Sequence, residues 1–122
     1  MAKLFTITIS LLAFCVSTAQ TYDYYYYSCN LADKLYYLGD YKSALDTLQQ
    51  AFSSVDYVHS SNLIDAYNCA IKMNDYEKAF LYGKKAMINS GEIHFVRHTA
   101  SKEFKKSTWF KVLQDSANIY KK

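Results

Sequence analysis

The repeated octapeptides LGDYKSAL (residues 38–45) and MNDYEKAF (residues 73–80) are the part of the sequence that decides the fold. They lie 35 residues apart, and in each an Asp-Tyr pair is followed three residues later by alanine. The match continues along the chain, since Ala51 returns as Ala86. A self-match at a spacing of about 20–50 residues is typical of stacked supersecondary units. We therefore expect two similar units that pack on each other.

Each octapeptide contains the start signal of a helix. Asp40 and Asp75 are favoured N-cap residues, because an aspartate side chain accepts hydrogen bonds from the free amides of the first turn. Ala44 and Ala79 follow at a position where a small side chain lets two helices cross closely. The tyrosine after each aspartate is expected to pack under the turn. Both octapeptides therefore predict the second helix of a helix hairpin.

An amphipathic stretch precedes each of these helices. Residues 24–38 and residues 62–73 both have apolar side chains at helical spacing. We expect the buried stripes to be Tyr27, Leu31, Leu35 and Leu38 in the first stretch, and Leu63, Ala66, Tyr67, Ala70 and Met73 in the second. The chain has no proline and only 3 glycines, so few residues interrupt a helix. The order helix, turn, helix thus occurs twice, and the predicted fold class is all-α.

The end of the chain has no clear self-match. After Gly91, the ranges 93–106 and 108–122 are each predicted to be one helix. Two stacked hairpins would leave an apolar end exposed, and an atypical final unit that covers this end is what repeat arrays need. Its apolar side is expected to consist of Phe104, Trp109, Phe110, Val112 and Leu113. We therefore predict a C-terminal capping helix pair.

These segments resemble the tetratricopeptide repeat (TPR) family, whose units of about 34 residues are helix–turn–helix hairpins. The resemblance rests on the two octapeptides together with Ala51 and Ala86. Early in the first helices, where the family has a large and then a small residue, this chain has Ser28 and Ala32, and in the second unit Leu63 and Tyr67. The resemblance implies a short α-solenoid with one repeat over residues 24–57, a second over 60–90 and capping helices over 92–121.

Residues 1–19 differ in composition from the rest of the chain. Lys3 supplies a positive charge, residues 4–16 form an apolar run, and residues 17–19 are small enough for cleavage. The run is shorter than the roughly twenty residues of a transmembrane helix, so a retained membrane anchor is the weaker interpretation. We expect a signal peptide cleaved near Ala19, a bacterial protein that is secreted or periplasmic, and no integral membrane segment after cleavage.

Cleavage would leave two cysteines, Cys29 and Cys69, in a compartment where disulfides form. The helix register places them on different hairpins and about five positions out of step, so the short Cα separation that a disulfide requires is not assured. We expect two small buried apolar side chains, and a single disulfide is the alternative.

Several classes of function lack support in the sequence. No motif supplies a nucleophile with a base or a pair of catalytic carboxylates, so no catalytic residue and no enzyme is predicted. Asp33, Asp40, Asp46, Asp65 and Asp75 are expected at helix caps and polar faces. His94 and His98 have the spacing of metal ligands but lack a third ligand, so no metal is expected. The glycines are isolated, so no nucleotide or other cofactor is expected.

In TPR proteins the first helices of the hairpins line a concave groove that holds extended or helical peptides, and the resemblance implies such a groove here. By position, the groove would contain Tyr26, Asp33, Tyr36, Tyr37, Ile64, Asn68, Ile71 and Lys72. Asn68 and Lys72 match two positions of the family's clamp for a terminal carboxylate, whereas Cys29 stands where that clamp has a lysine. We therefore expect an aromatic groove and an incomplete clamp.

Two features leave alternatives open. The chain contains 13 tyrosines, and the run at residues 24–27 is either a binding face or a loosely packed N-terminus, since consecutive residues of a helix cannot all face one core. Residues 23–65 are acidic on balance, whereas the rest of the chain, including Lys84, Lys85, Lys102, Lys105 and Lys106, is basic. The lysines are expected to form a solvated face, and nucleic acid is not an expected partner.

The sequence therefore favours a non-enzymatic scaffold or adaptor that is exported to the cell envelope and binds a protein or peptide. The alternative is an envelope-associated structural protein that contacts anionic surfaces, including the periphery of a membrane, through its basic C-terminal hairpin. Salt distinguishes the two, because contact with an anionic surface weakens as ionic strength rises.

Overall fold

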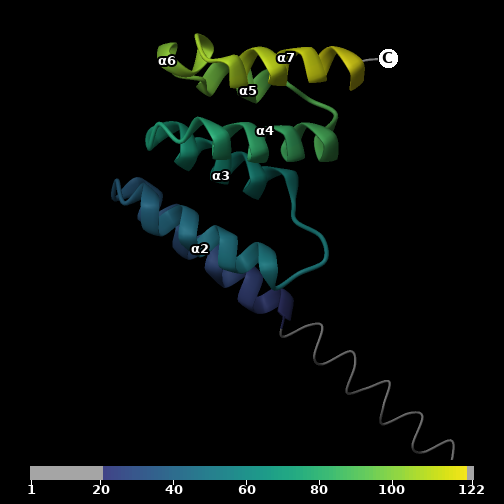
Figure 1. Ribbon diagram of the computed structural model, residues 1–122. Coiled ribbons are helices and arrows are strands. Elements are labelled where there is room, and N and C mark those ends of the chain that lie inside the picture. Colours follow the sequence, from purple (N-terminus) through teal and green to yellow (C-terminus); the bar gives the residue numbers. More distant parts are fainter. Residues whose placement is uncertain (1–20, 121–122) are drawn as a thin grey trace, which may run out of the picture.

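A computed structural model of the chain describes residues 21–120, apart from the side chain of Tyr120. The predicted signal peptide (residues 1–19) lies outside the described residues, as do Lys121 and Lys122. Within residues 21–120 the protein is all-α, as predicted, and this range contains no strand. The helices are the N-terminal helix (residues 21–37), α2 (Tyr41–Ser53), α3 (Ser60–Lys72), α4 (Tyr76–Ser90), α5 (His94–Thr99), α6 (Lys102–Lys105) and α7 (Thr108–Tyr120) (Figure 1).

The helices stack in layers along the chain (Figure 1). The N-terminal helix lies beside α2, α3 lies beside α4, and α5 and α6 lie beside α7. The central helix is α3, which packs against α2, α4 and α5, while α4 also packs against α7. The molecule is a short solenoid-like stack in which the predicted C-terminal unit lies on the second hairpin.

The turns of the two hairpins have the same hydrogen bonds. In the first turn, the amides of residues 38, 39 and 40 donate to the carbonyl oxygens of residues 34, 36 and 35, respectively. In the second turn, the amides of residues 73, 74 and 75 donate to the carbonyl oxygens of residues 69, 71 and 70, respectively. All six hydrogen bonds are 2.9–3.1 Å long. Gly39 (φ 82°) and Asn74 (φ 57°) occupy the left-handed region, which these two residue types tolerate best. The 35-residue repeat is therefore a repeat of turn geometry as well as of sequence.

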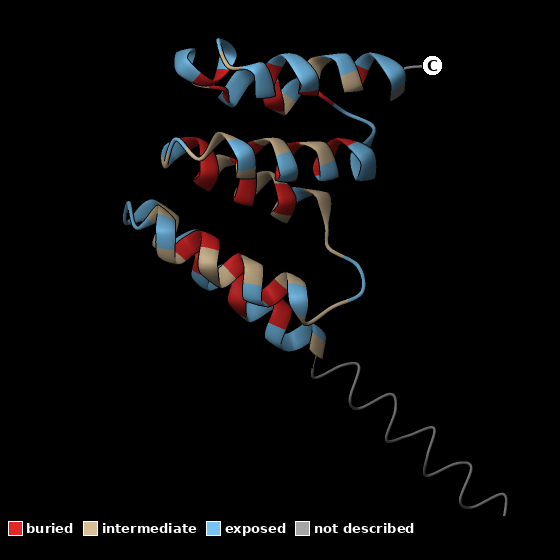
Figure 2. Cartoon of the chain, viewed as in Figure 1, coloured by how far each residue is buried: buried red, intermediate tan, exposed pale blue. Residues whose placement is uncertain are grey.

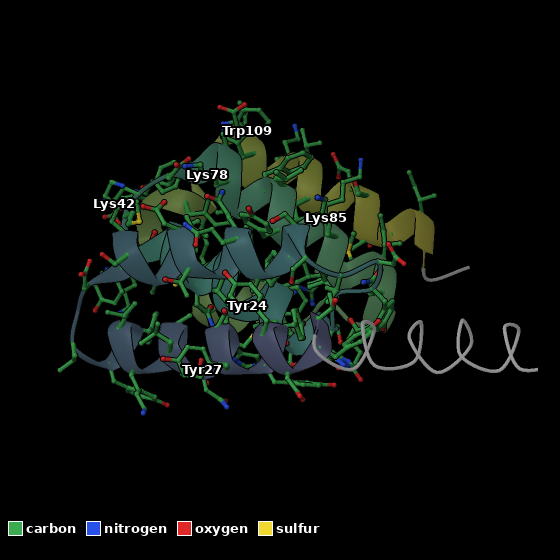
Figure 3. All side chains as sticks on the ribbon, turned by 90° about the horizontal axis from the view of Figure 1, so that it is seen from below. Tyr24, Tyr27, Lys42, Lys78, Lys85 and Trp109 are labelled. Carbon is green, nitrogen blue, oxygen red and sulfur yellow. The ribbon has the colours of Figure 1, made fainter. Side chains whose placement is uncertain are left out.

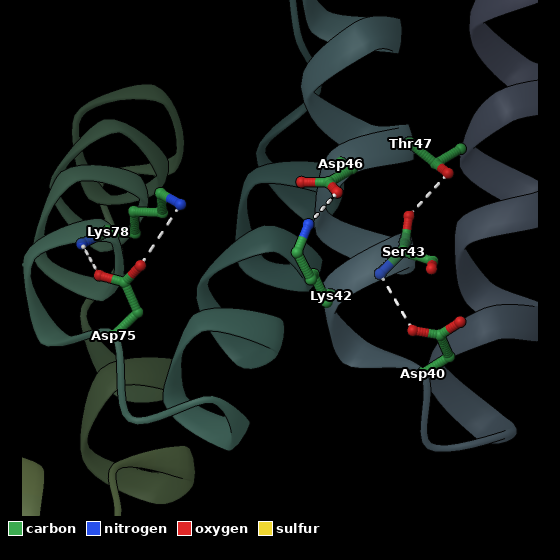
Figure 4. A network of polar contacts seen from close by, with 7 residues as sticks. All are labelled: Asp40, Lys42, Ser43, Asp46, Thr47, Asp75 and Lys78. Carbon is green, nitrogen blue, oxygen red and sulfur yellow. Dashed lines mark hydrogen bonds and ion pairs between the residues drawn. The ribbon is translucent and has the colours of Figure 1, made fainter.

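Both predicted N-caps are confirmed (Figure 4). The Asp40 carboxylate accepts a hydrogen bond from the Ser43 amide at 3.1 Å, and Asp75 accepts one from the Lys78 amide at 3.2 Å. Asp75 also forms an ion pair with the Lys78 ammonium at 3.4 Å. These aspartates fix the first residue of α2 and α4 because each satisfies an amide that has no partner within its own helix.

The small residues of the repeat lie where the helices approach each other. Ala44 and Ala79 have no exposed surface, and the same is true of Ala51 and Ala86. The buried residues lie on the inner surfaces of the layers, while the outer surfaces are exposed (Figure 2). The prediction that Ala44 and Ala79 allow close helix crossing agrees with this burial.

The stripe predicted for the N-terminal helix is wrong. Leu38 is 82% exposed, Tyr27 is 68% exposed and Leu31 is 38% exposed, and Leu35 is half-buried. The buried residues of this helix are Tyr25, Ser28, Cys29 and Ala32. The helix is rotated so that its small side chains face the neighbouring helices, because small residues permit a close approach that leucine would prevent. Apart from the buried Tyr25, its larger apolar side chains are half-buried or exposed, and the exposed Tyr24 and Tyr27 are labelled in Figure 3.

Tyr25 attaches the N-terminal helix to the start of α3. Its hydroxyl donates to Asn62 Oδ1 at 2.6 Å and accepts from the His59 amide at 3.2 Å. Burial raises the pKa of this hydroxyl to about 12, so it keeps its proton and the hydrogen bond to Asn62. One tyrosine of the N-terminal run is therefore a core residue, while Tyr24 and Tyr27 are exposed.

In α3 the predicted buried residues Leu63, Ala66, Tyr67 and Ala70 are confirmed, and Met73 is half-buried. Tyr67 is fully buried, and its hydroxyl donates to the carbonyl oxygen of Val96 at 3.2 Å. A Cβ at Gly83 would lie 3.2 Å from the Tyr67 ring and 3.2 Å from Leu113. Glycine in α4 thus leaves the space that the tyrosine in α3 occupies.

The C-terminal unit differs from the prediction in one respect. Residues 93–106 do not form one helix, because Ala100 is extended (ψ 126°) and Ser101 caps a new helix by accepting a hydrogen bond from the Phe104 amide. Phe104, Phe110 and Leu113 are buried as expected. Trp109 and Val112 were predicted on the same apolar side, but they are 38% and 48% exposed. The Trp109 ring packs against Phe80 of α4, with the ring centroids 5.2 Å apart.

Cys29 and Cys69 are both buried and both free, as expected for small apolar side chains. Burial raises the pKa of the Cys69 thiol to about 12 and that of Cys29 to about 11, so neither is a reactive thiolate near neutral pH. Among the helices within residues 21–120, none has the length and apolar character that crossing a membrane requires.

Candidate binding groove

Two adjoining pockets open on the side formed by the first helices of the layers. The acidic pocket has a volume of about 150 Å³ and is lined by Ala32, Asp33, Tyr36, Tyr37, Leu48, Asp65, Asn68 and Cys69. The second pocket, about 220 Å³, is lined by Tyr36, Asn68, Ile71, Lys72 and Thr99. Tyr36 and Asn68 belong to both pockets, so the two form one groove. It runs from the N-terminal helix across α3 to α5, and α5 occupies the position of a further first helix.

The floor of the acidic pocket is apolar and fully packed. Ala32 from the N-terminal helix, Leu48 from α2 and Cys69 from α3 are each buried. At the position equivalent to Ala32 in the second hairpin, 35 residues further on, the chain has Tyr67. The first hairpin thus has a small residue in the pocket floor where the second has a tyrosine.

Two carboxylates lie in the acidic pocket, Asp33 from the N-terminal helix and Asp65 from α3. Burial raises the pKa of Asp65 to about 6, and the negative charge of Asp33 contributes in the same direction. A hydrogen bond from the Asn62 amide group at 3.4 Å opposes this shift only weakly. Within residues 21–120, neither carboxylate has a lysine, arginine or histidine as an ion-pair partner. The pocket therefore has negative charge that no ion pair within the described residues neutralises.

Asn68 lies at the junction of the two pockets. Its Oδ1 atom is buried from solvent and accepts no hydrogen bond. It is the one buried side-chain nitrogen or oxygen without a partner in the part of the chain that the structure describes. Leaving such an atom unpaired costs about 1–3 kcal/mol, so an unpaired acceptor beside a pocket indicates a place where a donor from another molecule would be favourable.

Six of the eight predicted groove residues line the groove. Asp33, Tyr36, Tyr37 and Asn68 line the acidic pocket, and Ile71 and Lys72 line the second pocket. The other two lie elsewhere. Tyr26 stacks on His59, with the tyrosine hydroxyl 3.2 Å from His59 Nε2, near the loop before α3. Ile64 is half-buried and packs against the core.

Asp65 was not among the predicted groove residues and was expected with the capping and solvent-facing aspartates. Asp65 lies one helical turn before Asn68, so the two share a face of α3, just as Asp33 and Tyr36 share a face of the N-terminal helix. That spacing is the signal that identifies Asp65 as a groove residue. Thr99 was not predicted because the groove was expected to be lined by the two hairpins, whereas α5 belongs to the C-terminal unit.

Candidate metal ligands do not cluster in the described part of the chain. Residues 21–120 contain no group of three or more histidine, cysteine, aspartate or glutamate side chains that could hold a metal ion. His94 and His98 are both exposed. The groove is therefore the candidate site, lined by two carboxylates, two tyrosines and Asn68 above an apolar floor.

Comparisons of the sequence with protein-family models and curated proteins, and of the fold with solved structures, found no match.

Proposed function

We propose that the protein is a non-enzymatic TPR-like scaffold that holds an extended segment of a protein or peptide partner along the groove. The observation that supports this most strongly is the continuity of the two pockets through Tyr36 and Asn68. A continuous groove on one side of a stack of first helices suits a linear ligand, because successive ligand side chains can enter successive pockets. The signal-peptide character of residues 1–19 supports export to the cell envelope.

Tyr37 is the most informative groove residue for a test. It lines the acidic pocket and is 87% exposed, so its removal does not disturb the core. Tyr27 lies on the same helix and is 68% exposed, but it lines neither pocket. The two tyrosines are therefore a matched pair, one inside and one outside the groove.

The test selects binding peptides from a random displayed library and measures their affinity for the purified protein by calorimetry. We expect the Tyr37→Ala variant to lose about ten-fold or more in affinity, as for a central interface tyrosine, and Tyr27→Ala to behave as wild type. Equal losses in the two variants, or a loss confined to Tyr27→Ala, would assign binding to the outer face of the N-terminal helix and reject the groove.

The alternative function, contact with an anionic surface, is supported by Lys102, Lys105, Lys106 and Lys111, all of which are exposed and form no ion pair within residues 21–120. It makes a different prediction about salt. Binding to vesicles of anionic lipid that disappears at high ionic strength, together with peptide binding that is indifferent to Tyr37, would favour this alternative.

A further inference from the structure

The acidic pocket differs chemically from the rest of the groove. It is lined by two carboxylates and by Asn68, whose unpaired carbonyl oxygen is buried beside it. These acceptors come from two helices: Asp33 from the N-terminal helix, Asp65 and Asn68 from α3. Lys72, the cation of the groove, lines only the second pocket. A ligand group that enters the acidic pocket therefore meets acceptors and negative charge but no competing positive charge from its lining.

The shape and apolar lining of the acidic pocket also limit which ligand groups fit it. Its floor of Ala32, Leu48 and Cys69 is apolar, and Tyr36 and Tyr37 form part of its wall. A volume of about 150 Å³ is similar to that of an engineered cavity that binds benzene. The pocket thus has room for a flat polar group with an attached aliphatic stem, whose methylene groups can lie on apolar surface while the charged end meets the carboxylates.

From these features we propose that the acidic pocket binds an arginine side chain of the partner segment. A guanidinium group has five N–H donors in one plane, which can serve several acceptors on opposite walls at once. It also stacks on aromatic rings, which the tyrosines supply. The Asn68 carbonyl would gain its missing donor after a small rotation of its amide group. Lysine fits less well, because its ammonium is compact and does not stack as a plane.

This inference rests on the proposed function, since it assigns one subsite of the same groove. An arginine subsite requires more than peptide binding. The ligand must carry a positive charge at one position, and the protein must supply Asp33 and Asp65. Peptide binding that depends on Tyr37 but not on arginine would leave the proposed function standing and reject the arginine subsite.

The experiment uses two blocked pentapeptides, acetyl-Ala-Ala-Arg-Ala-Ala-amide and the same peptide with citrulline in place of arginine. Citrulline has the shape of arginine without its charge. Each peptide is titrated into the purified, ¹⁵N-labelled protein, and the amide signals of Asp33, Asp65 and Asn68, including the Asn68 side chain, are followed by NMR. We expect saturable shifts at these residues with the arginine peptide and about ten-fold weaker binding with citrulline, the usual effect of losing a charged hydrogen bond.

The protein variants are Asp65→Asn and Asp33→Asn, with Asp115→Asn as the control. Asp115 is exposed on α7 and lies outside both pockets. We expect each pocket variant to weaken binding of the arginine peptide about five- to ten-fold and the control to bind as wild type. Asp33 is exposed, so Asp33→Asn remains an informative variant even if Asp65→Asn alters the fold.

Three results would overturn the arginine subsite. They are equal binding of the citrulline peptide, an equal loss in Asp115→Asn, and an absence of shifts at the pocket residues. Calcium or magnesium ions that produce the same saturable shifts and displace the arginine peptide would also overturn it, because the pocket would then be a site for an inorganic cation.

Discussion

At the scale of single residues, Asp65 is an aspartate whose ionisation the fold disfavours. Burial and the neighbouring charge of Asp33 raise its pKa to about 6. Between the ordinary pKa of an aspartate, about 3.9, and this value, the folded protein binds more protons than the unfolded chain, so stability falls as the pH rises through that window. Above this pH window the folded protein bears the full free-energy cost of holding the Asp65 carboxylate in its charged form. A residue that destabilises the free protein in this way suits a site that a cation completes.

We therefore predict that Asp65→Asn stabilises the protein above the window. At about pH 7.5 the gain in free energy of unfolding should be about 1–2 kcal/mol, less than the full pKa shift implies because the side chain is partly exposed. The gain should shrink toward zero as the pH falls to about 4, where Asp65 is protonated in the folded protein. Urea unfolding at both pH values measures it, with Asp115→Asn as the control. Lower stability of Asp65→Asn at pH 7.5 would contradict this account.

The same residue shows what sequence can reveal at this scale. The aspartates that cap helices could be predicted, because a cap depends only on the residues that follow it, as at Asp40 and Asp75. Asp65 could not be distinguished from a solvent-facing residue, because its burial depends on the N-terminal helix across the groove. The unpaired Asn68 oxygen depends in the same way on neighbours distant in the sequence.

At the scale of elements, the two turns and the helices that follow them are the most predictable parts of the chain. Their hydrogen bonds repeat at 35 residues, and their caps and left-handed residues act locally. The N-terminal helix was predicted with the wrong buried face, because its orientation is decided by small residues such as Ala32, which hydrophobicity ranks below leucine. The break between α5 and α6 was missed because no glycine or proline marks it.

The stability of α4 should depend on its N-cap residue, Asp75. Replacing Asp75 with alanine removes the acceptor of the Lys78 amide, and we expect a loss of about 1 kcal/mol in the free energy of unfolding. Asp75→Asn keeps an acceptor at the cap and loses only the partly exposed ion pair with Lys78, so it should remain close to wild type. Chemical denaturation followed by circular dichroism compares the two. If both variants lost the same amount, the ion pair and not the cap would be responsible.

At the scale of the whole molecule, Tyr67 joins the second hairpin to the C-terminal unit. Its ring contacts those of Phe95 and Phe104 edge-on, with centroids 5.6 and 6.1 Å away, and its hydroxyl donates to Val96. In a repeat array each layer is stabilised mainly by its neighbours. The cooperativity between the C-terminal unit and the hairpins should therefore depend strongly on this side chain.

We predict that Tyr67→Ala costs about 3 kcal/mol or more, as for other buried aromatic residues, and separates two unfolding signals. Trp109 is the only tryptophan and reports on the C-terminal unit, whereas circular dichroism reports on all helices. In the wild type the two urea transitions should coincide, and in Tyr67→Ala the fluorescence transition should come first. Tyr27→Ala, which removes an exposed ring, is the control. Coincident transitions in Tyr67→Ala would place the junction elsewhere.

The contact between Tyr67 and Gly83 has a counterpart in the first hairpin, where the equivalent residues 35 positions earlier are Ala32 and Leu48. The first hairpin thus has its small residue on the first helix and its large one on the second, and the next hairpin reverses the two sizes. A single helix moved from one hairpin to the other would set tyrosine against leucine or alanine against glycine. Despite their identical turns, the two hairpins are not interchangeable parts, and any recombinant or evolved array built from this chain would have to exchange both members of such a pair together.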